Sequence, residues 1–382
     1  MHNAAAFRPV APTGSPVWRH RLVRLPPNRV WRTYTGGRLL DASAGVAAPQ
    51  DGRHPEDWLA STTRAINPPE ATRHASSPAS VPEGVSVVRV GDVDYDFREL
   101  LQADPSYFLG DPYVAQRGAD FALLVKRLDP AIRLHFQVHP TAAFARERLQ
   151  APSGKTEAYH VLATRPDVEN PCIYLGFRQT PSRDTLRAWI EQQDIAAITA
   201  AMNRIPVHAG DTYLVPGGVP HALGAGVLLI EIQEPSDLVV RFEFERGGYV
   251  LPEASRFMNR GLEFALDVFD PTPWPPTRVA EEARCQPRRR RALGVDSYQD
   301  DLIGPERTPC FRVRTSTLHA PVSKAEGVGH VVVVTGGAGS VRVGDTVEPL
   351  ALHDAFFVPA GLPPLQYQPE PDLHLLECYP PA

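Results

Sequence analysis

The chain has 382 residues, 43% of them hydrophobic, and a net charge of -5. This length and apolar content suffice for two domains with buried cores, and the near-neutral charge argues against a nucleic-acid-binding scaffold. No apolar run approaches the roughly 20 residues that span a bilayer, and residues 1–16 show no signal-peptide pattern. We therefore expect a cytoplasmic protein, a monomer or weak homo-oligomer, that acts on a small molecule without nucleic acid or membrane partners.

The first part of the chain, residues 1–80, is rich in Pro, Ala and Gly and shows few clear periods. Beyond it, short apolar runs bounded by Pro, Asp and Gly predict strands at 85–90, 121–128 and 132–139. In the last run, apolar residues alternate with His135, Gln137 and His139. Side chains two apart on a strand share a face, so these three polar side chains are expected on the same side.

The next predicted element is helical and covers about 182–204. Apolar residues recur there at near-helical spacing, and Asp184 is a candidate N-cap. Strands follow at 211–216, 227–233 and 238–244. Residues 271–306 are predicted to form a Pro/Arg-rich linker, and the arginine run 288–291 fits a solvated surface better than a phosphate-binding patch.

An internal repeat indicates two related β-units. GDTYLVPGGVPHALG at 210–224 resembles HDAFFVPAGLPPLQY at 353–367, with Asp211 aligned to Asp354. The shared pattern is strand, tight Pro/Gly turn, strand, which is typical of small antiparallel barrels. The first copy has His221 where the second has Pro364. An imidazole can bind a metal and a proline ring cannot, so we expect one working barrel and one without a metal site.

Three segments of the first unit offer metal ligands. Gln137 and His139 share a strand face, Glu157 follows the turn PSGKTE, and His221 follows the turn of the repeat. This mixed N/O set suits Zn²⁺ or another first-row divalent ion with one open position. A single strand histidine is more often structural than a ligand. The ordered combination of the three segments is far more specific and predicts a metal site.

These segments resemble type I mannose-6-phosphate isomerases of the cupin superfamily, particularly the shorter bacterial branch. Residues 121–140 are similar to the strand before the family's Q-V-H-P motif, and GKTEAYHVL at 154–162 is similar to its K-T-E motif. Residues 207–244 resemble its longest signature, through an S-D-x-x-x-R element. PEDWLAS at 55–61 is a weaker match.

The resemblance implies a mainly β fold of two cupin-type jelly-roll barrels with a helical insertion. We expect a catalytic region at 1–270 that includes the helical segment, the linker at 271–306, and a second barrel without a metal site at 307–382. The implied activity is an aldose–ketose isomerisation of mannose 6-phosphate, or a related sugar or sugar phosphate, through an enediol. The implied cofactor is one Zn²⁺ per chain.

The resemblance also implies which residues act on the substrate. Arg241, Lys155 and Glu231 fall on catalytic positions of the family, and Glu231 is the expected proton carrier. Substrate contacts are expected from Arg241, Lys155, His135 and Trp58.

His135 separates this chain from the family pattern, and the ligand residues leave two other kinds of protein open. His135 stands where the family commonly has serine, so the substrate pocket must differ in shape and polarity. A cupin oxygenase that uses Fe²⁺, or a non-catalytic sugar-binding cupin, would use similar ligand residues.

Overall fold

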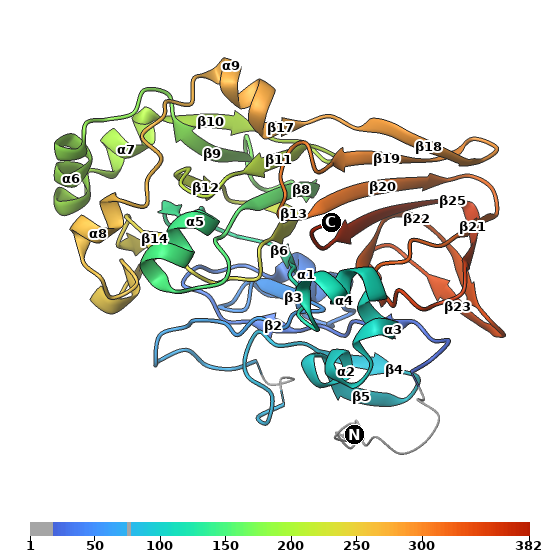
Figure 1. Cartoon of the computed structure of the whole chain (residues 1–382). Coiled ribbons are helices and arrows are strands. Elements are labelled where there is room, and N and C mark those ends of the chain that lie inside the picture. The colour runs from blue at the N-terminus through green and yellow to red at the C-terminus, as the bar shows by residue number, and fades with distance from the viewer. Residues whose placement is uncertain (1–17, 75–77) are drawn as a thin grey trace.

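A computed structural model of the chain describes residues 18–74 and 78–382. The fold is mainly β: antiparallel sheets form two β-barrels side by side, with helices grouped at the far end of the first barrel and around the N-terminal strands (Figure 1). The N-terminal stretch 1–16, where the sequence shows no signal-peptide pattern, lies outside the described residues. In the described chain, no helix is long and apolar enough to cross a membrane.

The first barrel consists of a seven-stranded and a five-stranded sheet. The seven-stranded sheet has the order β17 (Arg284–Cys285), β11 (Thr212–Val215), β8 (Glu157–Thr164), β13 (Val227–Gln233), β6 (Leu124–Leu128), β3 (Glu56–Leu59) and β2 (Arg29–Val30). The five-stranded sheet has the order β10 (Met202–Pro206), β9 (Cys172–Phe177), β12 (His221–Leu223), β7 (Gln137–Val138) and β14 (Val240–Arg241). A separate hairpin pairs β15 (Glu245–Arg246) with β16 (Tyr249–Val250).

The second barrel is built on an eleven-stranded sheet that contains both ends of the described chain. Its main path is β18 (Arg288–Gly294), β19 (Ser297–Ile303), β20 (Arg312–Leu318), β25 (Leu365–Tyr379), β22 (His330–Val343), β24 (Ala355–Val358), β1 (Val23–Arg24), β4 (Val87–Val90) and β5 (Val93–Asp96). Two further strands, β21 (Val322–Lys324) and β23 (Thr346–Leu350), pair with β25 and β22.

This topology differs from the expected division of the chain in two ways. Three strands from the N-terminal region join the C-terminal sheet, because β1 pairs with β24 and β4. The segment 271–306, expected as a linker, contains β17, β18 and β19. Its arginine run lies on β18 and is neutralised across the hairpin by acidic residues such as Asp300 and Asp301, so its polar composition reflects an exposed strand.

The helices are short. They are α1 (Arg38–Ser43), α2 (Phe97–Ala103), α3 (Pro105–Leu109), α4 (Asp111–Arg117), α5 (Ala142–Phe144), α6 (Arg183–Gln192), α7 (Ile195–Ala201), α8 (Leu262–Leu266) and α9 (Pro276–Arg278), with single turns η1 (Ala145–Leu149), η2 (Glu253–Ser255) and η3 (Val279–Ala283). The predicted helical insertion is present as α6 and α7. Its first cap is Ser182, whose hydroxyl accepts from Thr185 N, and Asp184 lies in the first turn instead.

Strand β13 is largely apolar because it is buried on both of its faces. All seven of its residues are buried. Ile230 and Ile232 pack into the core shared with the second barrel, whereas Leu229 packs into the interior core of the first barrel. A sheet covered on both faces loses the polar alternation of a half-exposed strand. Glu231 alternates with the two isoleucines and therefore faces the interior of the first barrel.

Candidate functional site

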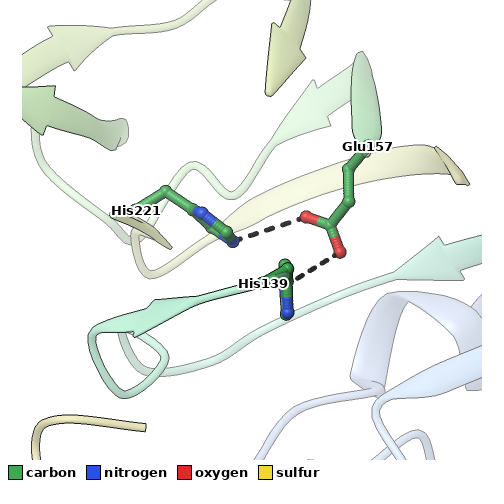
Figure 2. Close-up of side chains that lie close together, drawn as sticks. All are labelled: His139, Glu157 and His221. Carbon is green, nitrogen blue, oxygen red and sulfur yellow. Dashed lines mark ion pairs between the residues drawn. The ribbon is translucent and has the colours of Figure 1, made fainter. Parts of the chain in front are cut away.

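Three buried side chains converge inside the first barrel. His139 follows β7, Glu157 begins β8 and His221 begins β12, and one ligand atom from each lies within 4.8 Å of the others. The carboxylate of Glu157 is 3.2 Å from His139 Nε2 and 3.4 Å from His221 Nε2, as Figure 2 shows. Two imidazoles and one carboxylate at this spacing form a donor set for a divalent transition metal.

Strand register brings these residues together. His221 on β12 pairs with Gln137 on β7, while Glu157 on β8 pairs with Val215 just before the Pro/Gly turn that leads to His221. The side chain of Gln137 lies at the same centre, with its Nε2 3.2 Å from His221 Nε2. A half-turn of this amide would present its oxygen instead of its nitrogen. The sequence motifs thus meet as expected, and Gln137 is placed to be a fourth ligand.

Both histidines are held in the tautomer that a metal ligand needs. His139 Nδ1 donates to Leu238 O at 2.8 Å, and His221 Nδ1 donates to Val219 O at 2.8 Å. Burial and the nearby Lys155 lower the pKa of His139 to about 3, and burial also lowers the pKa of His221. Neutral rings with the proton on Nδ1 leave both Nε2 lone pairs available at the centre.

Positive charge is already present beside the Glu157 carboxylate. Lys155 Nζ lies 2.6 Å from Glu157 Oε1 and 3.1 Å from His139 Nε2. Burial alone would raise the pKa of Glu157, but Lys155 and the histidines hold it well below its usual range. Tyr159 donates its hydroxyl to the second carboxylate oxygen at 2.7 Å. The Glu157 carboxylate is therefore ionised at neutral pH, with its charge balanced by Lys155.

The Glu234 carboxylate binds the backbone on both sides of Lys155. Glu234 accepts from Gly154 N at 3.2 Å and from Thr156 N at 2.9 Å, and Lys155 N donates to Pro140 O at 3.0 Å. A Cβ at position 154 would lie only 2.4 Å from the backbone nitrogen of Ala142, so the close approach requires glycine. This packing fixes the lysine relative to the metal-binding strand.

A pocket partly open to solvent, about 460 Å³ in all, adjoins the centre. Five of the predicted site residues line it: His135, Gln137, Lys155, Glu231 and Arg241.

Glu231 lies on the pocket wall in a chain of ion pairs that the sequence did not predict. It is only 3% exposed, and its Oε2 is 2.9 Å from Lys126 Nζ. Burial and the charge of Glu157 raise the pKa of Glu231 to about 7, against the opposing effect of Lys126. A carboxylate with a pKa near neutrality can both accept and donate a proton at physiological pH.

Further ion pairs connect Lys126 to residues of the N-terminal segment. Glu56 lies 3.8 Å from Lys126 and 2.9 Å from Arg32, and Arg32 reaches Asp237 at 3.3 Å. Burial would raise the pKa of Glu56, but Arg32 and Lys126 bring it down to about 2. The scarcity of lysine was the one sequence signal that could have identified Lys126, because a chain with only three lysines among 39 basic residues uses an ammonium selectively.

Arg241 differs from the other cations of the pocket. It has no ion-pair partner within residues 18–74 and 78–382, and its Nη1 donates only to Ser255 O at 3.3 Å. Burial lowers its pKa. His135 lies on the same wall, with Nδ1 at 3.0 Å from Glu243 O and a buried Nε2 that has no hydrogen-bond partner in the described chain. The pocket therefore presents one unpaired guanidinium and one unpaired imidazole nitrogen.

Trp58 corrects an expectation of the sequence. Its side chain is fully buried and does not line the pocket, because Arg32 and Lys126 stack over its ring at 4.8 and 4.7 Å. Its Nε1 donates to Glu56 at 2.8 Å. Trp58 thus packs against the charged side chains of the pocket and does not itself line it.

Comparison with known proteins is consistent with this geometry. No family model matches the chain. A mannose-6-phosphate isomerase of Streptococcus mutans is 33% identical over 316 residues, which cover 81% of this chain and 91% of that protein.

Solved structures resemble the whole fold. The mannose 6-phosphate isomerase of Bacillus subtilis matches with a TM-score of 0.71 at 21% identity, over 94% of this chain and 99% of that one. A mannose 6-phosphate isomerase bound with zinc and yttrium matches with a TM-score of 0.64 at 16% identity, over 95% and 99% of the two chains. These likenesses confirm the expected mainly β fold of two barrels with a helical insertion.

Proposed function

The chain belongs to the mannose-6-phosphate isomerase family, and we propose that it interconverts mannose 6-phosphate and fructose 6-phosphate with a bound zinc ion. It is an aldose–ketose isomerase, as its relation to the Streptococcus mutans enzyme indicates. The single observation that carries the substrate assignment is the pocket itself. It places a cation-binding centre, a carboxylate with a near-neutral pKa and an unpaired guanidinium around one space.

Zinc fits the residues of the centre. His139, Glu157, His221 and Gln137 would hold it, because two neutral imidazoles, a carboxylate and an amide oxygen match its preference for N and O ligands. The related structure that holds zinc supports the same choice. When bound, a divalent ion polarises the oxygens of the sugar and stabilises negative charge on them. Lys155 beside Glu157 adds a fixed positive charge for the same oxygens.

Glu231 is the proposed proton carrier. Isomerisation removes a proton from the carbon beside the carbonyl and returns one to the neighbouring carbon, so one group can act first as base and then as acid. A carboxylate whose pKa is raised to about 7 can serve in both roles. Lys126, at 2.9 Å, holds the carboxylate in place and favours its ionised form before the first transfer.

Arg241 is the proposed partner of the substrate phosphate. Arg32, Lys126 and Lys155 are each neutralised by a carboxylate. Arg241 is the guanidinium of the pocket that is left without such a partner in the described chain, and the planar guanidinium binds phosphate in a bidentate manner. The same argument favours a phosphorylated substrate over a free sugar.

The test compares mannose 6-phosphate with mannose in a coupled assay of the zinc-loaded protein. We expect turnover of the phosphorylated sugar, and we expect Arg241→Gln to lower its kcat/KM by about 10- to 100-fold, the range for losing a hydrogen bond to a charged group. Arg246→Gln is the matched control, because Arg246 lies outside the pocket beside Glu243. Equal turnover of both sugars by the unmodified protein would contradict the assignment of the substrate.

A further inference from the structure

The side chain of Tyr159 contacts the candidate metal centre from the barrel wall. Tyr159 lies two residues after Glu157 on β8, so the two side chains share the face that points into the first barrel. Its hydroxyl lies 2.7 Å from Glu157 Oε2. The residue is only 1% exposed and is not among the residues that line the active-site pocket. Tyr159 therefore contacts a ligand residue from a position that the substrate does not occupy.

The Tyr159 hydroxyl is the donor in this contact. Burial raises its pKa well above the usual range, and the neighbouring carboxylate of Glu157 raises it further, so the phenol keeps its proton. An ionised carboxylate only accepts hydrogen bonds. A hydrogen bond to a charged acceptor is stronger and more directional than one between neutral groups, so it is suited to fixing the orientation of the carboxylate.

This bond holds the carboxylate in an orientation that faces both histidines. Glu157 Oε1 is 3.2 Å from His139 Nε2, and Oε2 is 3.4 Å from His221 Nε2. Both imidazoles carry their proton on Nδ1, so neither donates to the carboxylate. Among residues 18–74 and 78–382, only Lys155 and Tyr159 donate hydrogen bonds to the Glu157 side chain. Lys155 also lines the pocket, so Tyr159 is the donor that belongs to the metal centre alone.

The second barrel lacks this hydroxyl. The register of the two barrels places His330 of β22 where β8 has Glu157, because each pairs with the valine before the Pro/Gly turn. Two residues further along, β22 has Val332 where β8 has Tyr159. A valine side chain has no hydrogen-bond donor. The phenol and the ligand carboxylate are thus present together in one barrel and absent together from the same places in the other.

We propose that Tyr159 is a positioning residue for the metal: its hydroxyl holds the Glu157 carboxylate toward the two histidines and thereby sets the affinity for zinc. The inference rests on the zinc site of the proposed function, but not on the identity of the sugar. Groups that hydrogen-bond to metal ligands orient those ligands, and losing one typically weakens metal binding by about 10- to 100-fold.

The test is the zinc affinity of Tyr159→Phe, measured by competition with a chelator of known affinity. Phenylalanine fills the same space in the core and removes only the hydroxyl. We expect the Kd for zinc to rise about 10- to 100-fold. Because Tyr159 does not line the pocket, saturating zinc should restore most of kcat/KM. Activity lost through misfolding would not return when zinc is added, and that result would overturn the proposal.

Tyr213→Phe is the matched control. Tyr213 lies directly opposite Tyr159 on β11 and is also buried, but its hydroxyl forms no hydrogen bond with the described residues. Its removal should leave zinc affinity unchanged, and an equal loss in both variants would overturn the proposal. Equal zinc affinity of Tyr159→Phe and the unmodified protein would also overturn it while leaving the zinc site in place. An unmodified protein that binds no zinc would overturn both.

Discussion

The two barrels share one strand–turn–strand plan but differ in what their interiors can bind. In the first barrel, Val215 before the turn pairs with Glu157, and in the second, the aligned Val358 pairs with His330. After the turn, His221 in the first copy corresponds to Pro364 in the second. The first barrel therefore gathers a carboxylate and two imidazoles, whereas the corresponding place in the second barrel has one imidazole.

The second barrel also contains a buried carboxylate, that of Glu377. Glu377 lies across the sheet from Val332, as Glu231 lies across from Tyr159 in the first barrel. Its carboxylate pairs with Lys324 and also accepts from Gln299 and Ser316. Glu157 is also paired with a lysine, Lys155, but it lies within 3.4 Å of two neutral imidazole nitrogens that could share an ion with it. The difference between the barrels lies in the partners of a few side chains and not in the fold.

The largest expected effect is a loss of activity, and it should follow from changing the buried carboxylate Glu157 but not from changing Glu377. Glu157→Gln should abolish metal binding and lower kcat/KM by about 10³-fold or more, because it removes the charged ligand of the centre. Glu377→Gln should leave turnover at 25 °C nearly unchanged but destabilise the fold by about 3 kcal/mol, since it removes the nearest carboxylate from Lys324 and leaves Glu326, at 3.4 Å, and the Ser316 hydroxyl as its partners. Assays and thermal unfolding of both variants test this contrast. Loss of activity in a folded Glu377→Gln protein would contradict it.

The second prediction concerns the proton carrier of the first barrel. Glu231→Gln should lower kcat by about 10² to 10⁴-fold, the usual contribution of a general base. Metal content should stay normal, because Glu231 is not among the ligand residues. A steady-state assay with metal analysis of the same sample measures both. A variant that keeps its full kcat would exclude Glu231 as the base.

The pH profile should report the same carboxylate. Glu231 must be ionised to accept a proton, so kcat/KM should fall as the pH drops through its pKa. That pKa is raised by burial to about 7, and a bound divalent ion would lower it, so the acid limb should lie at or below about pH 7. Metal content measured at each pH excludes metal loss as the cause. A flat profile between about pH 5 and 8 with metal retained would contradict the assignment.

The convergence of His139, Glu157 and His221 could be predicted from sequence because each lies in a short motif with its own turn or strand. Gln137 and His139 are two apart on one strand, and His221 follows a turn that occurs twice. The supporting charges could not be predicted in the same way. Glu56 and Arg32 come from a segment without clear periodicity, and they reach the pocket only because β3 pairs with β6. Such pairing depends on contacts between distant segments, which local patterns do not encode.

The fold, too, could be predicted from the sequence only in part. The repeat predicted two β-units, and the helical spacing predicted the insertion. The joining of β1 and β4 to the C-terminal sheet left no local signal, because a two-residue strand such as β1 is too short to show a period. The Pro/Arg-rich composition of 271–306 indicated a linker, whereas the segment contains three strands. Its arginine run is exposed, as expected, and is neutralised by acidic residues such as Asp300 on the neighbouring strand β19.

The smallest expected effect concerns this arginine run. Arg289 lies more than half exposed and pairs with Asp300 at 2.6 Å. Exposed ion pairs typically contribute at most about 1 kcal/mol, so Arg289→Gln should change the free energy of unfolding by less than that and leave kcat/KM unaltered. Denaturant unfolding and the coupled assay check both values. A marked rise in KM would show instead that the run binds substrate phosphate.

The most direct test of the account is the metal content of the purified protein, measured beside turnover for the unmodified chain and His221→Ala. We expect one zinc per chain with isomerase activity in the unmodified protein, and neither metal nor activity in His221→Ala. Two ions per chain would show that the second barrel also binds metal. Full activity in His221→Ala would show that the centre around Glu157 is not where the reaction occurs.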